Sequence, residues 1–184
     1  MVSVRVKRWT RAEYDRIAQA GLFAPDERVE LIEGEIVEMS PQDPEHSTAI
    51  VVGEETLRSA FGADYHVRSQ LPLALGDDSE HEPDLAVVQG PRRAFAASHP
   101  STASLVVEVS DSSLPFDRDR KGPMYARAGI PEYWIVNIVD HLLEVHRVPR
   151  ADVGYATRLL LTSSDVISPL ALPTARIEVR EMLP

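Results

Sequence analysis

Residues 105–110 read Leu-Val-Val-Glu-Val-Ser, a short apolar run that contains one carboxylate, Glu108. Its apolar residues do not alternate with polar ones, which is typical of a strand buried on both faces in the middle of a sheet. A second run of this kind, Leu-Ala-Val-Val, occupies residues 85–88 directly after Asp84. A buried ionised carboxylate is unfavourable unless a metal ion or a basic group compensates it. Asp84 and Glu108 are therefore the first candidates for a functional site, and the alternatives are a loop acid and a solvated or Arg-paired Glu.

Capping and turn signals around these runs predict further helices and strands. A capping-box pattern from Thr10 to Glu13 predicts a helix that buries Tyr14 and Ile17 and ends near Gly21. Further helices are predicted at 46–62 and 124–128, and further strands at 29–32 and 35–39 (a hairpin), 65–70, 71–75, 133–138, 142–148, 155–162 and 176–179. This order predicts a single α/β domain over residues 1–184, in which helices flank a mixed β-sheet.

Composition and charge exclude several classes of function. The chain has 184 residues, no cysteine and a formal net charge of −10, so disulfides, thiolate metal sites and a cysteine nucleophile are excluded. We expect a cytoplasmic protein, because the sequence has no membrane-spanning apolar run and no signal-peptide core at its start. The negative charge disfavours non-specific binding to nucleic acid. Acidic residues are concentrated at 26–45 and 77–84, so these segments either face solvent or converge on a cation.

Lys121 follows Glu108 after a polar turn and could complete a catalytic set. Asp117 and Lys121 are four residues apart, so one continuous helix would place them on one face. Pro123 favours the alternative that the helix begins near Gly122, with Lys121 at its edge. Two carboxylates and a lysine are the minimum set for metal-assisted phosphodiester hydrolysis, in which carboxylate oxygens hold Mg²⁺ and the lysine orients or activates the attacking water.

Four stretches together resemble the Uma-two-like family of bacterial endonucleases, within the restriction-endonuclease-like (PD-(D/E)XK) superfamily. They are residues 29–41, Glu82-Pro-Asp-Leu-Ala-Val87, residues 105–110 and residues 121–136. The resemblance covers about residues 10–148. It implies a restriction-endonuclease-like mixed sheet flanked by helices, Mg²⁺ or Mn²⁺ as the cofactor, and nuclease activity on nucleic acid, with DNA as the first expectation. Related nucleases commonly act as dimers, so the resemblance also leaves a homodimer open.

The resemblance also implies roles for individual residues. Asp84 and Glu108 become the metal ligands, Lys121 the catalytic lysine, and Glu30 an acid that an early element adds to the same site. His46 falls where the family has a histidine at the start of its second helix, and it is either a donor or base near the site or a solvated capping side chain. The remaining histidines show no ligand spacing: His66, His81, His99, His141 and His146.

Asn137 departs from the family pattern, which usually has Asp at this position. If that Asp serves the site, its loss weakens this protein; if it is structural, Asn can replace it. The main alternative function is thus a catalytically weak or inactive member that acts as a protein- or nucleic-acid-binding module. A glycosidase is a second alternative, but its two carboxylates need no neighbouring lysine. Basic residues that could contact phosphates, or form ordinary surface charge, are Arg5, Lys7, Arg8, Arg11, Arg92, Arg93, Arg118 and Arg120.

Overall fold

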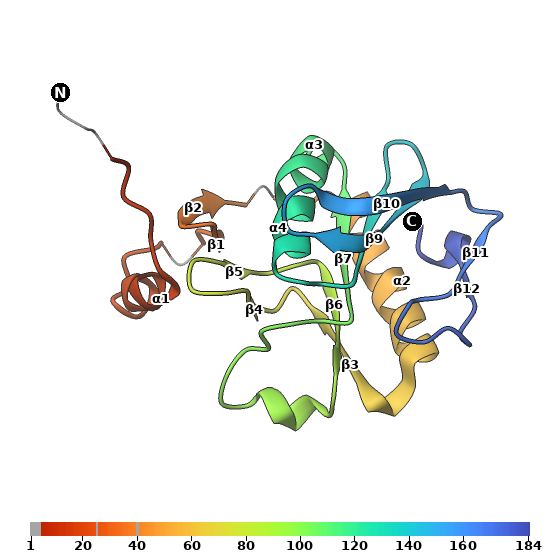
Figure 1. Cartoon of the computed structure of the whole chain (residues 1–184), viewed down its shortest axis with the longest axis horizontal. Coiled ribbons are helices and arrows are strands. Elements are labelled where there is room, and N and C mark those ends of the chain that lie inside the picture. Colours follow the sequence, from red (N-terminus) through yellow and green to blue (C-terminus); the bar gives the residue numbers. More distant parts are fainter. Residues whose placement is uncertain (1–4, 25, 40) are drawn as a thin grey trace.

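A six-stranded mixed sheet forms the centre of the protein (Figure 1). The structure is a computed structural model that describes residues 5–24, 26–39 and 41–184. The first four residues, which belong to the segment in which the sequence analysis expected no signal peptide, lie outside the described residues. The strand order is β10-β9-β8-β7-β6-β3; β7 and β8 are parallel and the other neighbours antiparallel. The predicted mixed α/β fold is therefore confirmed. The strands are β3 (Tyr65–Ser69), β6 (Leu85–Gln89), β7 (Leu105–Ser110), β8 (Glu132–Asn137), β9 (Leu142–Arg150) and β10 (Gly154–Leu161).

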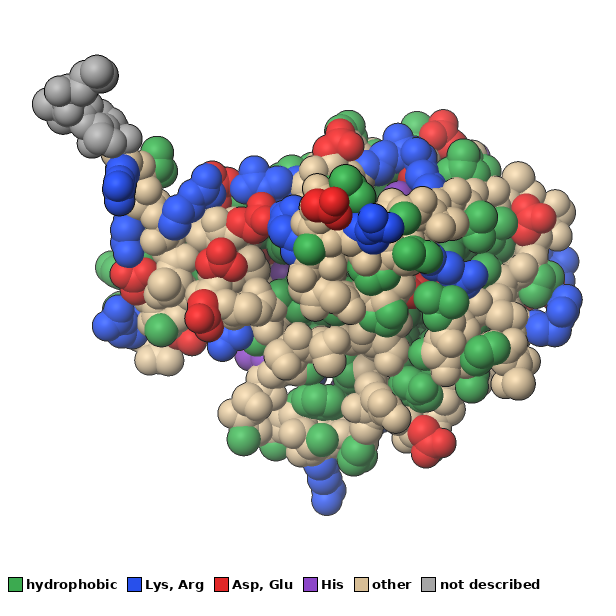
Figure 2. Space-filling model, in the orientation of Figure 1, with side chains coloured by type: hydrophobic (Ala, Val, Ile, Leu, Met, Phe, Trp, Pro, Cys, Tyr) green, Lys and Arg blue, Asp and Glu red, His purple; other side chains and the backbone are tan. Residues whose placement is uncertain are grey.

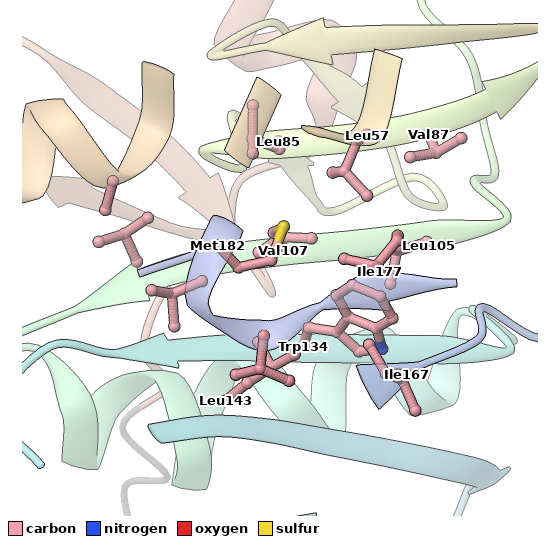
Figure 3. Close-up of a cluster of buried hydrophobic side chains, with 14 of the residues drawn as sticks. Leu57, Leu85, Val87, Leu105, Val107, Trp134, Leu143, Ile167, Ile177 and Met182 are labelled. Carbon is pink, nitrogen blue, oxygen red and sulfur yellow. The ribbon is translucent and has the colours of Figure 1, made fainter. Parts of the chain in front are cut away.

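One face of this sheet packs against a long helix and the C-terminal segment. Leu57 of the helix and Met182 near the C-terminus lie in the same apolar layer as Trp134 of β8 (Figure 3). Trp134 is fully buried. The elements on this face are α2 (Pro44–Phe61), β11 (Val166–Ile167), β12 (Ile177–Glu178) and η4 (Val179–Glu181).

The opposite face is covered by three consecutive helical segments. They are α3 (Leu114–Phe116), the π-helical turn η3 (Asp117–Lys121) and α4 (Gly122–Arg127). Tyr133 faces this side while Trp134 faces the other, as predicted for neighbouring residues of a strand. The buried side chains of this layer include Leu114, Met124, Tyr125, Ile130, Tyr133 and Ile135.

A smaller four-stranded sheet, of order β2-β1-β5-β4, lies next to the central sheet (Figure 1). Its strands are β1 (Val29–Ile32), β2 (Glu35–Glu38), β4 (Leu73–Ala74) and β5 (Glu80–His81). The predicted hairpin is confirmed: β1 pairs with β2, and Gly34 has φ +78° in the connecting turn. The helix α1 (Arg11–Gln19) has the predicted capping box.

Burial of α1 was predicted wrongly. Tyr14 and Ile17 are only half-buried, and no residue of α1 is buried. The helix lies at the end of the molecule beyond the small sheet (Figure 1), where it can be covered on one side only. Its Tyr14 hydroxyl donates to the carbonyl of Val29 in β1 at 2.8 Å.

The other differences from the sequence-based prediction concern short elements. The strand predicted at 71–75 is limited to residues 73–74, and the strand predicted at 176–179 to residues 177–178. The short elements β5, β11, η1 (Gly62–Asp64) and η2 (Arg92–Phe95) were not predicted. Strands of two residues are too short to show a periodicity in the sequence. No helix within the described ranges is long and apolar enough to cross a membrane.

Candidate active site

Pairing of β6 with β7 brings the two predicted carboxylates together. Asp84 directly precedes β6, Glu108 lies in β7, and the register pairs Leu85 with Val107. Both carboxylates are buried, with 5% and 2% of their surface exposed. The backbone N–H of Val109 donates to Asp84 Oδ2 at 2.8 Å, and the backbone nitrogen of Asp84 lies 3.5 Å from Glu108 Oε2. We refer to Asp84 and Glu108 below as the carboxylate pair.

The π-helical turn η3 places Lys121 against this pair. Lys121 Nζ lies 3.2 Å from Glu108 Oε2 and 3.4 Å from Asp117 Oδ1. The backbone N–H of Gly122 donates to the carbonyl of Asp117, which is the wide hydrogen bond of a π turn. The helix α4 thus begins at Gly122, as Pro123 predicted, and the π turn before it still keeps Lys121 and Asp117 on one side.

Glu30 reaches the site through a histidine that the sequence analysis missed. Glu30 is buried in β1, and its Oε2 lies 2.6 Å from Nδ1 of His81. His81 Nε2 lies 3.7 Å from Glu108 Oε1. Glu30 therefore lies in the predicted site, but it is linked to Glu108 by His81. No local signal could identify His81, because it lies in the two-residue strand β5 and is positioned by pairing of β5 with β1.

Tyr125 of α4 orients Glu108. Its hydroxyl donates to Glu108 Oε1 at 2.7 Å, and its ring stacks on the imidazole of His81 with centroids 5.3 Å apart. The Glu108 carboxylate is thereby held at Oε1, while its Oε2 lies beside Lys121. The four-residue spacing of Lys121 and Tyr125 in the sequence is consistent with both side chains contacting the same carboxylate.

Two side chains flank Asp84. His46, in the first turn of α2, has its Nε2 3.3 Å from Asp84 Oδ2, so the structure brings this histidine to the site. The Gln70 amide donates to Asp84 Oδ1 at 3.4 Å, and sequence analysis missed it. Gln70 has φ +50°, a left-handed backbone conformation that is unfavourable for a residue with a side chain by about 1–3 kcal/mol.

The carboxylates and Lys121 shift each other's pKa values strongly. Burial raises the pKa of Glu108 well above its usual range, and the charges of Asp84 and Asp117 add to this rise against the opposing effect of Lys121. Burial would also raise the pKa of Asp84, but His46 and the Val109 N–H lower it, so Asp84 is ionised. Burial alone would lower the pKa of Lys121, but Glu108 and Asp117 raise it, so Lys121 keeps its proton.

A cleft of about 330 Å³ opens onto these groups. The β2 hairpin strand, the start of α2 and the segment before η3 form its walls. The residues that line it include Glu30, Glu38, Met39, His46, Asp84, Glu108, Asp111, Phe116, Asp117 and Lys121. The acidic segments 26–45 and 77–84 therefore both contribute carboxylates to one cleft, although other acids of these segments face solvent.

The donor set of the cleft fits a hard divalent cation. Mg²⁺ binds one or two carboxylates and completes its shell with water and phosphate oxygens, and the carboxylate pair offers such oxygens. Within residues 5–24, 26–39 and 41–184, buried Asp117 Oδ1 and His46 Nε2 have no hydrogen-bond partner of ordinary geometry, so these polar groups of the cleft are not fully satisfied. Among the described residues, no three Asp, Glu or His side chains form a complete cage, so water and substrate would supply the other ligands.

Asn137 does not contact the carboxylate pair. Its amide nitrogen donates to Asp140 Oδ2 at 2.9 Å and to Glu144 Oε1 at 3.0 Å, and its Oδ1 accepts from the Asp140 N–H. Burial would raise the pKa of Glu144, but hydrogen bonds from His146, Arg118 and Asn137 lower it, so Glu144 is ionised. Asn137 thus has a structural role at the end of β8.

We expect Asn137→Asp to lower stability and to leave cleavage unchanged. The substitution removes a hydrogen-bond donor to buried Glu144 and places a new carboxylate next to those of Asp140 and Glu144. This should lower the free energy of unfolding by about 1–3 kcal/mol at pH 7. The loss should shrink at acidic pH as the introduced carboxyl takes up a proton, because the lowered pKa of Glu144 keeps Glu144 ionised there. Urea unfolding at several pH values measures it. A gain in nuclease rate would instead show that residue 137 serves the site.

Most of the predicted phosphate-binding residues are paired with acids. On the face seen in Figure 2, basic and acidic side chains lie side by side over the end formed by α1 and the small sheet. For the paired residues, the attraction to these acids favours the alternative of ordinary surface charge. The pairs are Lys7–Glu13, Arg8–Glu35, Arg11–Glu80, Arg118–Glu144 and Arg120–Glu35.

A mixed sheet that brings two carboxylates and a lysine together is the arrangement of the restriction-endonuclease-like class. The chain belongs to the Uma2 family, described as "Putative restriction endonuclease", whose family model matches residues 11–180. The predicted family is thereby confirmed, and a nuclease-like function is supported. No curated protein matches the sequence.

Comparison with solved structures supports the same fold. A protein from Anabaena variabilis ATCC 29413, described as "a putative nuclease belonging to DUF820", superposes with a TM-score of 0.72 at 14% sequence identity. The match covers 95% of this chain and 97% of the other. At this identity the likeness establishes the fold, and the roles of individual residues have to be argued from the cleft.

Proposed function

We propose that the protein is an endonuclease that hydrolyses phosphodiester bonds of DNA with Mg²⁺ or Mn²⁺. The observation that carries this proposal is the contact of Lys121 Nζ with Glu108 Oε2 at 3.2 Å, beside Asp84 in a single cleft. Membership of a family described as restriction endonucleases supports it. A glycosidase would have no use for a protonated lysine against its carboxylate.

Asp84 and Glu108 would hold the ion, which when bound polarises the scissile phosphate and lowers the pKa of a coordinated water. Protonated Lys121 then stabilises negative charge that develops on the phosphate. Tyr125 fixes Oε1 of Glu108, and His46 holds Asp84 from the other side. Glu30 contacts His81, and His81 in turn lies beside Glu108, so we assign Glu30 a positioning role.

The test is cleavage of supercoiled plasmid and single-stranded DNA with Mg²⁺, with Mn²⁺ and with EDTA. We expect wild-type cleavage to require the metal and Asp84→Ala to reduce the rate by more than about 100-fold, since even residues that only support metal ligands contribute 10–100-fold. Asp152→Ala, which changes an exposed Asp between β9 and β10, is the matched control and should cut like wild type.

Failure of the wild type to cut with any metal would contradict the proposal. The protein would then be a binding module that retains the fold. Equal cutting by Asp84→Ala and wild type would place the active site elsewhere. Calorimetric titration with Mn²⁺ tests the metal site independently of cleavage. The proposal expects the wild type to bind Mn²⁺ and Asp84→Ala not to bind it.

A further inference from the structure

Arg68 in β3 is a buried arginine without an acidic partner. Only 6% of its surface is exposed, and no carboxylate in the described part of the chain forms an ion pair with it. The half-buried arginines of the protein all have such a partner: Arg11, Arg58, Arg118, Arg120 and Arg147 pair with Glu80, Glu54, Glu144, Glu35 and Glu132. The most deeply buried guanidinium is thus the one whose charge is not neutralised.

The contacts of Arg68 leave part of its hydrogen-bonding capacity unused. Its Nη2 donates to the carbonyl of Pro72 at 3.2 Å, and its guanidinium lies 5.8 Å from the ring centroid of Phe95. Its Nε is buried and has no hydrogen-bond partner among the described residues. A buried charge is unfavourable unless it is paired, so this arrangement needs an anion to compensate it.

Arg68 shares a sheet face with the carboxylate pair. It stands opposite Ala86 in the antiparallel pairing of β3 with β6, and Ala86 is two residues from Asp84. Gln70, whose amide contacts Asp84, lies two residues beyond Arg68 along the chain, just past the end of β3.

On the side away from the cleft, a histidine lies next to Arg68 on β3. His66 is the next residue on the same face, and its buried Nδ1 has no hydrogen-bond partner in the part of the chain that the structure describes. Burial, and then the charges of Arg68, Arg58 and Arg92, lower the pKa of His66. β3 is an edge strand of the central sheet, so a ligand can approach along its open side.

We propose that Arg68 binds a phosphate of the substrate strand, next to the phosphate that is cleaved, and that the strand leaves the cleft along the edge of β3. This inference rests on the proposed nuclease function. Guanidinium binds phosphate through two parallel hydrogen bonds, which suits a site that must hold an anion in one register. Arg68 would thus supply the attraction that the acidic cleft lacks.

The test is DNA binding without cleavage, measured by fluorescence anisotropy in EDTA. A labelled single strand and its duplex are titrated at about 50 to 200 mM NaCl with wild type, Arg68→Gln, Arg68→Lys and the control Arg150→Gln, an exposed arginine at the end of β9. We expect Arg68→Gln to weaken binding about tenfold and to reduce the salt slope by about 0.7 for the single strand or about 0.9 for the duplex. The control should match wild type.

Two further readouts exclude a merely structural role. Removing an uncompensated charge should leave the urea midpoint of Arg68→Gln unchanged or raise it. Arg68→Lys should keep the salt slope but lose affinity, since an ammonium group cannot form the double contact. If Arg68→Gln failed to fold, wild-type affinity in Arg68→Lys would overturn the inference.

The outcomes separate this inference from the proposed function. Metal-dependent cleavage by the wild type, with the same affinity and salt slope in Arg68→Gln, would overturn the role of Arg68 and leave the nuclease in place. A wild type that neither binds nor cuts DNA would overturn both. Weaker binding and a reduced slope in Arg68→Gln, with unaltered folding, would support the phosphate site.

Discussion

Replacing Lys121 by alanine is expected to reduce DNA cleavage by about 10²- to 10³-fold, the usual effect of removing one group that stabilises transition-state charge. Lys121 stays protonated between Glu108 and Asp117, so it carries positive charge to the cleft at neutral pH. Alanine removes this charge without filling the cleft. The rate should be measured in single turnovers at saturating Mg²⁺, where substrate affinity does not contribute.

The chain offers a matched control for this substitution. Lys7 is the other lysine of the sequence; it forms an exposed ion pair with Glu13, and neither residue lines the cleft. Lys7→Ala should cut at the wild-type rate. A Lys121→Ala variant that cuts within a few-fold of wild type would contradict the assigned role.

Thermal unfolding shows whether Lys121→Ala remains folded. Removal of one member of a buried ion pair can lower stability by about 3–5 kcal/mol, because Glu108 and Asp117 lose their compensating charge. A divalent cation bound to the carboxylate pair would replace part of that charge. We therefore expect Mn²⁺ to raise the melting temperature of Lys121→Ala more than that of wild type.

Replacing Glu132 by alanine is expected to cause a large loss of stability, about 3–5 kcal/mol. Glu132 is fully buried in β8 and accepts hydrogen bonds from Trp134 Nε1 at 3.0 Å, Arg147 Nε at 2.8 Å and the backbone N–H of Leu170 at 2.7 Å. Alanine would leave these donors without their acceptor. Arg147 also donates to Ser168, so the substitution should loosen the C-terminal segment from the sheet.

Urea unfolding followed by circular dichroism measures this loss. Glu178→Ala is the control, because Glu178 forms an exposed ion pair with Arg180, and such pairs contribute up to about 1 kcal/mol. The urea midpoint should fall far more for Glu132→Ala than for Glu178→Ala. Similar midpoints for the two variants would show that Glu132 does not hold the C-terminal segment.

Much of the fold could be predicted from local patterns. The runs at 85–88 and 105–110 do not alternate because both faces of β6 and β7 are covered, and they became inner strands. The hairpin at Gly34 followed from turn chemistry. Asp84 and Glu108 stood out because each carboxylate adjoins or interrupts an apolar run, and both are buried, as are Glu30, Asp117, Glu132 and Glu144.

Other parts of the site depend on contacts between distant segments. His81 reaches Glu108 because the two-residue strand β5 pairs with β1, and Gln70 reaches Asp84 through a left-handed backbone turn. Neither feature has a periodic signal, since each depends on one residue or one pairing. Asn137 could likewise be judged only once its partners Asp140 and Glu144 were known.

The pairing of charged residues shows most clearly what the sequence determines and what only the tertiary structure determines. Composition alone establishes that acidic residues outnumber basic ones. The order of the residues predicts the apolar strands, since hydrophobic patterning depends on neighbours in the sequence. Only the tertiary structure decides which arginines are neutralised. Arg120 of η3 pairs with Glu35 of β2, whereas Arg68 forms no ion pair with any acid of the described residues. The reason is physical: Coulomb attraction and desolvation depend on distance and burial in space, which a linear sequence does not contain.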